Sequence, residues 1–97
     1  MKPTSCLINT SRGAIVDEAD LAQALRERRI AAAGLDVYKC EPKAELELLG
    51  QERVVLAPHL GSATPATRMK MANIAADNIL SVFGGSRPPT CVNLEVL

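Results

Sequence analysis

Residues 6–25, "CLINTSRGAIVDEADLAQAL", combine an apolar run, a polar turn and the start of a helix. Residues 5–10 form a short apolar segment that ends in polar side chains, which predicts a buried strand. Gly13 in the turn permits a close backbone approach or a positive φ. Asp17 is a good helix N-cap, and the acidic residues that follow it suit the helix dipole. A strand followed directly by a helix is typical of α/β proteins.

The predicted helix after Asp17 is amphipathic. Leu21 and Leu25 recur at helical spacing and predict one apolar stripe, which continues to Arg28. Arg26, Arg28 and Arg29 are expected in the last turn, where positive charge is favourable.

The rest of the chain repeats this alternation of strand and helix. Two further strands are predicted over 30–37 and 54–57, one helical turn over 46–50, the longest helix over 66–83, and a candidate edge strand over 92–97. Thr64 or Thr67 would cap the longest helix, and Gly84 and Gly85 would end it. The predicted fold class is therefore α/β: a parallel sheet of about three strands, flanking helices and a long C-terminal helix.

Composition excludes several classes of function. The chain has 97 residues, 47% of them hydrophobic and 23% charged, which is typical of a globular protein. Eleven basic residues balance eleven acidic ones, so no partner among nucleic acids or anionic membranes is expected. No apolar segment is long enough to span a bilayer. The cysteines Cys6, Cys40 and Cys91 are isolated, which predicts reduced thiols in a cytoplasmic protein without disulfides or a metal site.

Each predicted strand ends in polar or charged residues that could form one site. Arg12 follows the first strand, Asp36 and Glu41 follow the second, and His59 follows the third. Parallel strands place their carboxyl ends at one edge of the sheet, where ligands bind. A carboxylate beside an imidazole stabilises the protonated ring, which can then donate a proton, and an arginine can bind a substrate carboxylate. Taken singly, these residues also fit a surface arginine, an aspartate that caps a neighbouring loop, a solvated loop charge and a structural histidine.

Three consecutive motifs carry a family resemblance. They are "LINTSRGAIVDEADLAQAL", "AAGLDVYKCEP" and "VVLAPHLGSATPATRMKM". The order and spacing of these motifs resemble those of the NAD-dependent D-2-hydroxyacid dehydrogenases. Their residue sequences look most like those of the glyoxylate and hydroxypyruvate reductases. The resemblance implies the C-terminal half of a Rossmann-like sheet.

The resemblance also implies roles for individual residues. Arg12, Glu41 and His59 would be the catalytic trio of a reductase that acts on a small 2-oxo acid, such as glyoxylate or hydroxypyruvate, with NADH or NADPH. Its nicotinamide contacts would be Thr10, Ser11, Arg12, Asp36, His59, Gly61 and Ser62. Asp36 would accept a hydrogen bond from the nicotinamide amide, and Glu41 would pair with His59.

The chain departs from the family in what it lacks. No G-x-G-x-x-G turn is present to bind the pyrophosphate, and no residue that selects NAD or NADP can be identified. Residues 1–83 would then be a partial NAD(P)-binding domain, and residues 84–97 a tail that returns to a missing substrate domain. We expect little dehydrogenase activity from this chain alone, and self-association or a homodimer through an unpaired sheet edge. Two alternatives are an NAD-binding, corepressor-like interaction module and an inactive truncated remnant.

Overall fold

The computed structural model describes residues 1–96, which form two compact units. The first unit is Met1–Gly61, and the second begins at Ser62. The domain boundary predicted near residue 83 stays a prediction. Within residues 1–96, no helix is long and apolar enough to cross a membrane.

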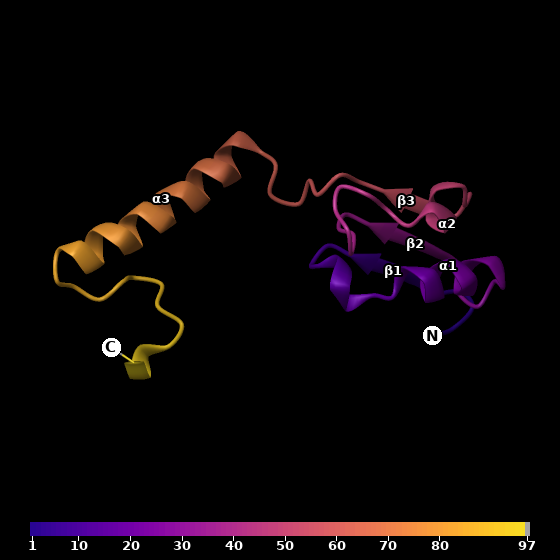
Figure 1. The fold of residues 1–97 in the computed structure, drawn as a ribbon, viewed down its shortest axis with the longest axis horizontal. Helices are drawn as coiled ribbons and strands as arrows, with labels where there is room; N and C mark the ends of the chain where they lie inside the picture. Colours follow the sequence, from indigo (N-terminus) through magenta and orange to yellow (C-terminus); the bar gives the residue numbers. More distant parts are fainter. Residues whose placement is uncertain (97) are drawn as a thin grey trace. The chain divides into compact units, whose positions relative to one another are not determined.

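The first unit is built on a parallel sheet, as predicted. Its strands are β1 (Cys6–Asn9), β2 (Ala32–Leu35) and β3 (Val54–Leu56). They lie side by side in the order β1-β2-β3, and both pairings are parallel (Figure 1). Asn9 pairs with Leu35, and Leu35 pairs with Leu56, so the carboxyl ends of all three strands lie at one edge.

Helices cover one face of this sheet. They are η1 (Gly13–Ile15), α1 (Glu18–Arg26) and α2 (Leu46–Leu49). The core between the helices and the sheet consists of Leu21, Ala22, Leu25, Ile30, Ala33, Leu35, Tyr38 and Leu48. On the other face, Ile8 and Val55 flank Gly34 in register and are 68% and 72% exposed. A parallel sheet is normally covered on both faces, so this unit presents one open apolar face.

The α1 helix begins as predicted and ends earlier than predicted. The Asp17 side chain accepts hydrogen bonds from the amides of Ala19 and Asp20, each at 3.1 Å, so Asp17 is the N-cap. The helix stops at Arg26, and Arg28 adopts a left-handed φ of 55°. The predicted placement in the last helical turn is therefore right for Arg26 and wrong for Arg28 and Arg29. The chain reverses there to enter β2, and a left-handed residue is a common way to end a helix.

The second unit contains the predicted long helix, α3 (Pro65–Phe83). Thr64 caps it by accepting a hydrogen bond from the Thr67 amide at 3.2 Å, and Pro65 occupies the first turn. Asn78 binds the following tail through Thr90, to which it donates at 2.7 Å and from which it accepts at 3.1 Å.

The predicted edge strand over 92–97 is wrong for the residues that the structure describes. Residues there form η2 (Leu94–Val96), a 3-10 helix, and Leu97 lies outside the described part. A strand needs a neighbour for its backbone hydrogen bonds, and the described sheet contains only β1, β2 and β3.

Candidate active site

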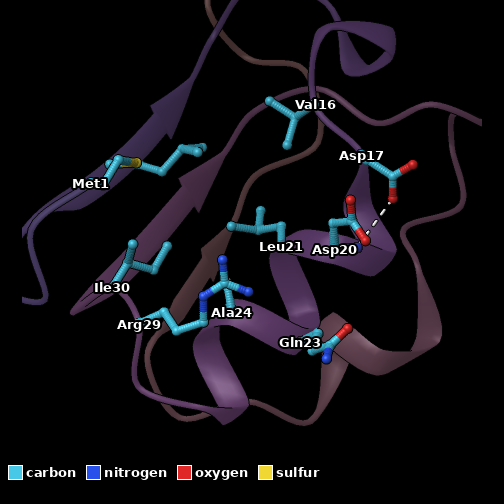
Figure 2. A pocket seen from close by; sticks show the side chains of 10 residues that line it. Met1, Val16, Asp17, Asp20, Leu21, Gln23, Ala24, Arg29 and Ile30 are labelled. Atoms are coloured by element: carbon cyan, nitrogen blue, oxygen red, sulfur yellow. Dashed lines mark hydrogen bonds between the residues drawn. The ribbon is translucent and has the colours of Figure 1, made fainter.

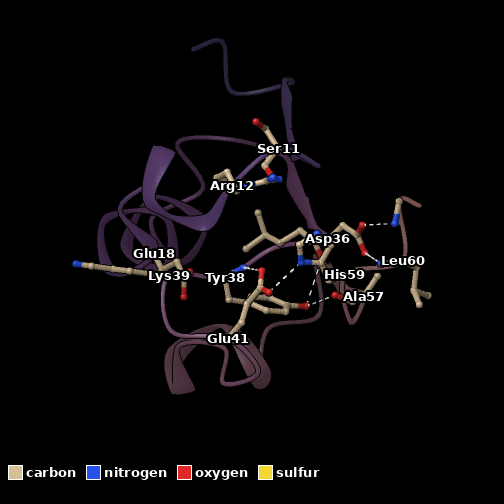
Figure 3. A network of polar contacts seen from close by, with 12 residues as sticks. Ser11, Arg12, Glu18, Asp36, Tyr38, Lys39, Glu41, Ala57, His59 and Leu60 are labelled. Atoms are coloured by element: carbon tan, nitrogen blue, oxygen red, sulfur yellow. Dashed lines mark hydrogen bonds and ion pairs between the residues drawn. The ribbon is translucent and has the colours of Figure 1, made fainter. Parts of the chain in front are cut away.

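The segments that follow the three strands meet at the carboxyl edge of the sheet. Arg12 follows β1, Glu41 lies in the loop after β2, and His59 follows β3. Figure 3 shows Glu41 and His59 pointing toward each other, and Arg12 beside Ser11, apart from this pair. The predicted contact between the carboxylate and the imidazole therefore occurs, whereas the place of Arg12 in the same site stays a prediction.

Glu41 and His59 form a direct ion-pair contact. The His59 Nδ1 atom lies 2.9 Å from Glu41 Oε2, and the other carboxylate oxygen accepts a hydrogen bond from the Tyr38 amide at 3.2 Å. The hydrogen bond from His59 lowers the pKa of Glu41, and the Tyr38 amide lowers that pKa further. Both side chains stay partly exposed, 45% for His59 and 38% for Glu41. The pair is thus held in position and remains open to a reactant.

A buried carboxylate holds the segment that carries His59. Asp36 is 9% exposed, and its two oxygens accept hydrogen bonds from the amides of Leu60 and Gly61, each at 2.7 Å. His59 itself has a positive φ of 56°, an uncommon conformation that is often found at functional sites. A Cβ atom on Gly61 would lie 3.2 Å from the Asp36 carboxylate, so glycine suits this close approach.

These contacts explain the charge on Asp36. Of the two partners that the sequence suggested, a cofactor amide and a neighbouring loop, the structure shows the loop, through two backbone amides. The contact with a cofactor amide stays a prediction. A carboxylate has about four lone-pair sites, so Asp36 can still accept one further donor. Thr10 and Ser11 are exposed beside this edge. The polar groups of Thr10, Ser11 and Asp36 therefore fit the nicotinamide end of a dinucleotide. The sequence contains no glycine-rich turn that would hold its pyrophosphate. Ser62 starts the second unit, so its cofactor contact stays a prediction.

Arg12 lies on a turn that Asn9 stabilises. Asn9 is 6% exposed, donates to the Arg12 carbonyl at 2.9 Å and accepts from the Ser11 amide at 3.1 Å. The Arg12 guanidinium donates to the Ser11 carbonyl at 2.6 Å. In the described residues it forms no ion pair with Glu41, although its charge contributes to lowering the pKa of Glu41. The guanidinium is exposed and can bind an anion without breaking an internal salt bridge.

Each of the three segments is held by one buried polar side chain. Asn9 holds the Arg12 turn, Glu18 holds the Glu41 loop, and Asp36 holds the His59 segment. These three are the buried polar residues of the described chain. Sequence reasoning missed Asn9 and Glu18 as supports. For Asn9, the only signal in the sequence was its place at the end of an apolar strand. For Glu18, the favourable position of an acid in the first turn of α1 already accounted for its charge, so no further role was sought.

The pair lines only a small hollow. Tyr38, Glu41, Pro42, Pro58 and His59 surround about 90 Å³. Small-molecule sites usually enclose roughly 300–1,000 Å³. The hollow beside the pair is therefore smaller than a usual small-molecule site.

Comparison with known proteins indicates the family of this chain. Residues 1–61 match the family model described as the NAD-binding domain of D-isomer-specific 2-hydroxyacid dehydrogenases. The whole chain is 52% identical to a glyoxylate reductase of Thermococcus onnurineus and 48% identical to glyoxylate/hydroxypyruvate reductase B of Enterobacter agglomerans. It spans 29% and 30% of the lengths of these proteins.

Solved structures show the same fold. A Thermus thermophilus crystal structure is 43% identical with a TM-score of 0.83, covering 95% of this chain and 30% of that one. The NADPH-dependent glyoxylate/hydroxypyruvate reductase of Sinorhizobium meliloti, crystallised with NADP and malonate, is 44% identical with a TM-score of 0.80. That match covers 84% of this chain and 25% of the reductase. The chain, with its parallel sheet and its carboxylate–imidazole pair, belongs to the family of D-isomer-specific 2-hydroxyacid dehydrogenase NAD-binding domains.

Proposed function

We propose that this chain supplies the proton donor and the substrate-carboxylate site of an oxidoreductase that reduces a small 2-oxo acid. The single observation that carries the proposal is the 2.9 Å contact between His59 Nδ1 and Glu41 Oε2 at the ligand-binding edge of the sheet. Such an acid–imidazole pair is a common source of a proton at neutral pH.

The roles of the three side chains follow from their positions. Glu41 accepts the Nδ1 proton of His59, which fixes the orientation of the ring and leaves Nε2 as the atom that faces a reactant. His59 then donates a proton from Nε2 to the substrate carbonyl oxygen. Arg12, exposed on the neighbouring turn, binds the substrate carboxylate. Glu41 stays ionised throughout because its pKa is lowered.

The cofactor is NADH or NADPH. When bound, the nicotinamide supplies the hydride that the carbonyl carbon accepts. Asp36 would accept from its amide, and Thr10, Ser11, Gly61 and Ser62 would complete the contacts. Glyoxylate and hydroxypyruvate are the proposed substrates because the relatives at about half identity are named for them.

A chimaera tests this function directly. This chain would replace the aligned segment of the Thermococcus onnurineus glyoxylate reductase, so that the missing parts are supplied by a relative. We expect NADH or NADPH oxidation with glyoxylate, reduced by roughly two to four orders of magnitude in His59→Ala. Arg12→Lys should raise KM for glyoxylate, since a lysine cannot form the bidentate contact.

Controls in the same chimaera separate chemistry from folding. Glu52→Gln, at an exposed residue that precedes β3 and so lies at the opposite edge of the sheet from the proposed site, should leave turnover unchanged. A His59→Ala chimaera that keeps full activity would overturn the proposal. Dinucleotide binding by calorimetry without turnover would favour the interaction-module alternative instead.

A further inference from the structure

Glu18 is a buried carboxylate with no role in the proposed chemistry. It is the first residue of α1 and is 7% exposed. An ionised side chain at such a site needs compensation. In the described residues none of the salt bridges involves Glu18. Its compensation comes from backbone amides and from its place in the first turn of a helix, where negative charge is favourable.

Both carboxylate oxygens of Glu18 bind the loop that carries Glu41. Oε1 accepts from the Lys39 amide at 2.5 Å, and Oε2 accepts from the Glu45 amide at 3.2 Å. The two donors lie on opposite sides of Glu41 in the sequence. One side chain on α1 therefore closes both ends of the loop.

The segment between these anchors is a tight turn. The Lys43 amide donates to the Cys40 carbonyl at 3.0 Å, and Glu41 and Pro42 lie at the tip. The amides of Tyr38 and Lys39, which are adjacent, donate to two different carboxylates, those of Glu41 and Glu18. In the view of Figure 3, Glu18 and His59 lie on opposite sides of Glu41. Glu18 thus holds the loop from the side away from the imidazole.

We propose that Glu18 is a positioning residue that fixes the loop over residues 39–45, so that the Glu41 carboxylate meets His59. It acts through Glu41 and does not contact the reactants. The anchoring itself follows from the contacts above, and its effect on turnover rests on the proposed function.

The structural test needs no activity. Glu18→Gln keeps the size of the side chain but leaves one acceptor oxygen for two amide donors. We expect amide hydrogen exchange at Lys39 or Glu45 to become faster by on the order of tenfold. In the same variant, the NMR titration of the Glu41 carboxyl should move up toward its ordinary pKa of 4.5, as the contact with His59 loosens. Glu18→Ala, which removes both acceptors, should show both effects more strongly.

Asp20→Asn is the matched control. Asp20 is an exposed acid in the same first turn of α1, and among the described residues its side chain makes no hydrogen bond to the loop. It should leave both readouts unchanged, which separates loop anchoring from the loss of a helix-terminal charge. The proposal would be overturned if the folded Glu18→Gln variant kept the amide exchange rates of Lys39 and Glu45 and the titration of the Glu41 carboxyl unchanged. This holds for any level of turnover in the chimaera.

Turnover in the chimaera gives the functional consequence. Glu18→Gln should lower kcat about tenfold with little change in KM, since substrate binding by Arg12 is untouched. If the chimaera has no activity even with Glu18 present, the proposed function fails while the loop readouts still decide the role of Glu18. An active chimaera whose kcat is the same with glutamate and glutamine would overturn the positioning role in catalysis.

Discussion

The backbone of Gly13 lies directly against the backbone of Tyr38. A Cβ atom on Gly13 would lie 1.9 Å from the Tyr38 carbonyl carbon and 2.3 Å from the Lys39 nitrogen. These atoms belong to the main chain and cannot rotate away as a side chain could. The turn after β1 and the loop after β2 are therefore locked together next to the Arg12, Glu41 and Glu18 side chains.

Gly13→Ala should be strongly destabilising for this reason. We expect the free energy of unfolding to fall by about 3 kcal/mol or more, because the added methyl group forces two backbone segments apart. Urea denaturation followed by circular dichroism measures it. Gly50→Ala is the control, since no atom lies within 4 Å of its added Cβ, and it should change stability by less than about 0.5 kcal/mol. Equal effects of the two substitutions would contradict the close packing at Gly13.

The Glu41–His59 contact should make stability depend on pH in the acidic range. The pKa of Glu41 lies below its ordinary value of 4.5 in the folded chain, chiefly through the hydrogen bond with His59. The unfolded state then binds the proton more readily, so the contribution is complete above about pH 4.5 and is lost as the pH falls through the folded value.

Urea midpoints between about pH 3 and 7 would show this loss. His59→Ala removes the main cause of the shift, so its acid-induced loss of stability should be smaller than that of the unchanged chain. Glu52→Gln, at an exposed residue, serves as the control and should keep the original profile. A His59→Ala profile that falls as steeply as the original would show that another group causes the acid sensitivity.

Tyr38 should make the stability of the folded chain depend on pH in the alkaline range as well. Its hydroxyl donates to the Ala57 carbonyl at 2.7 Å, and its pKa is raised above 10.0 by burial and then by the charge of Asp36. A raised pKa means that the neutral form is favoured on folding, so stability is complete below about pH 10 and falls as the pH rises through the folded value.

Tyr38→Phe tests both parts of this statement. At neutral pH it should cost about 1 kcal/mol, because the Ala57 carbonyl loses its donor. Above about pH 10 the variant should lose less stability than the unchanged chain, since phenylalanine does not ionise. Thermal unfolding across this range measures the difference, and parallel curves would contradict the assignment.

Local patterns in the sequence predicted the elements well because local physics decides them. The cap at Asp17, the stop after Phe83 and the apolar strands follow from residues near each element. The edge strand over 92–97 failed because strand formation depends on a neighbouring strand, which no local pattern records. For the same reason, the sequence could not show that Glu18 anchors the loop that carries Glu41, because its partners are more than twenty positions away in the sequence.

Arg53 should contribute to stability although it is partly exposed. Its guanidinium donates to the Leu25 carbonyl at 2.5 Å, to the Ala31 carbonyl at 3.0 Å and to the Ile30 carbonyl at 3.3 Å. It thereby satisfies one carbonyl in the last turn of α1 and two carbonyls just before β2, and it ties them to the start of β3. Arg53→Ala should lower the free energy of unfolding by about 2 kcal/mol, measured by urea denaturation.

Arg29→Ala is the matched control for Arg53→Ala. Within residues 1–96, the Arg29 side chain makes only an exposed 3.7 Å ion pair with Glu27, so its removal should cost under about 0.5 kcal/mol. A loss of equal size in both variants would show that the carbonyl contacts of Arg53 add nothing beyond a surface charge.

Self-association is the last expectation, and the sheet supports it. In the described residues, β1 and β3 each have one unpaired edge, and Ile8 and Val55 are exposed on the open face. A hollow of about 480 Å³ lies between β1 and α1, with Leu7, Val16 and Ile30 among its lining residues (Figure 2). Unpaired edges beside exposed apolar surface promote association between copies.

Sedimentation velocity at micromolar concentration should therefore show species larger than a monomer. Ile8→Lys places a charge on an edge strand and on the open face at once, so it should shift the distribution toward monomer. Ile15→Lys introduces the same charge at a similarly exposed residue outside the sheet, 67% exposed, and should leave the distribution unchanged. A single monomeric species for the unchanged chain would contradict the expectation, and equal dispersal by both variants would assign the association to general hydrophobicity instead of the sheet.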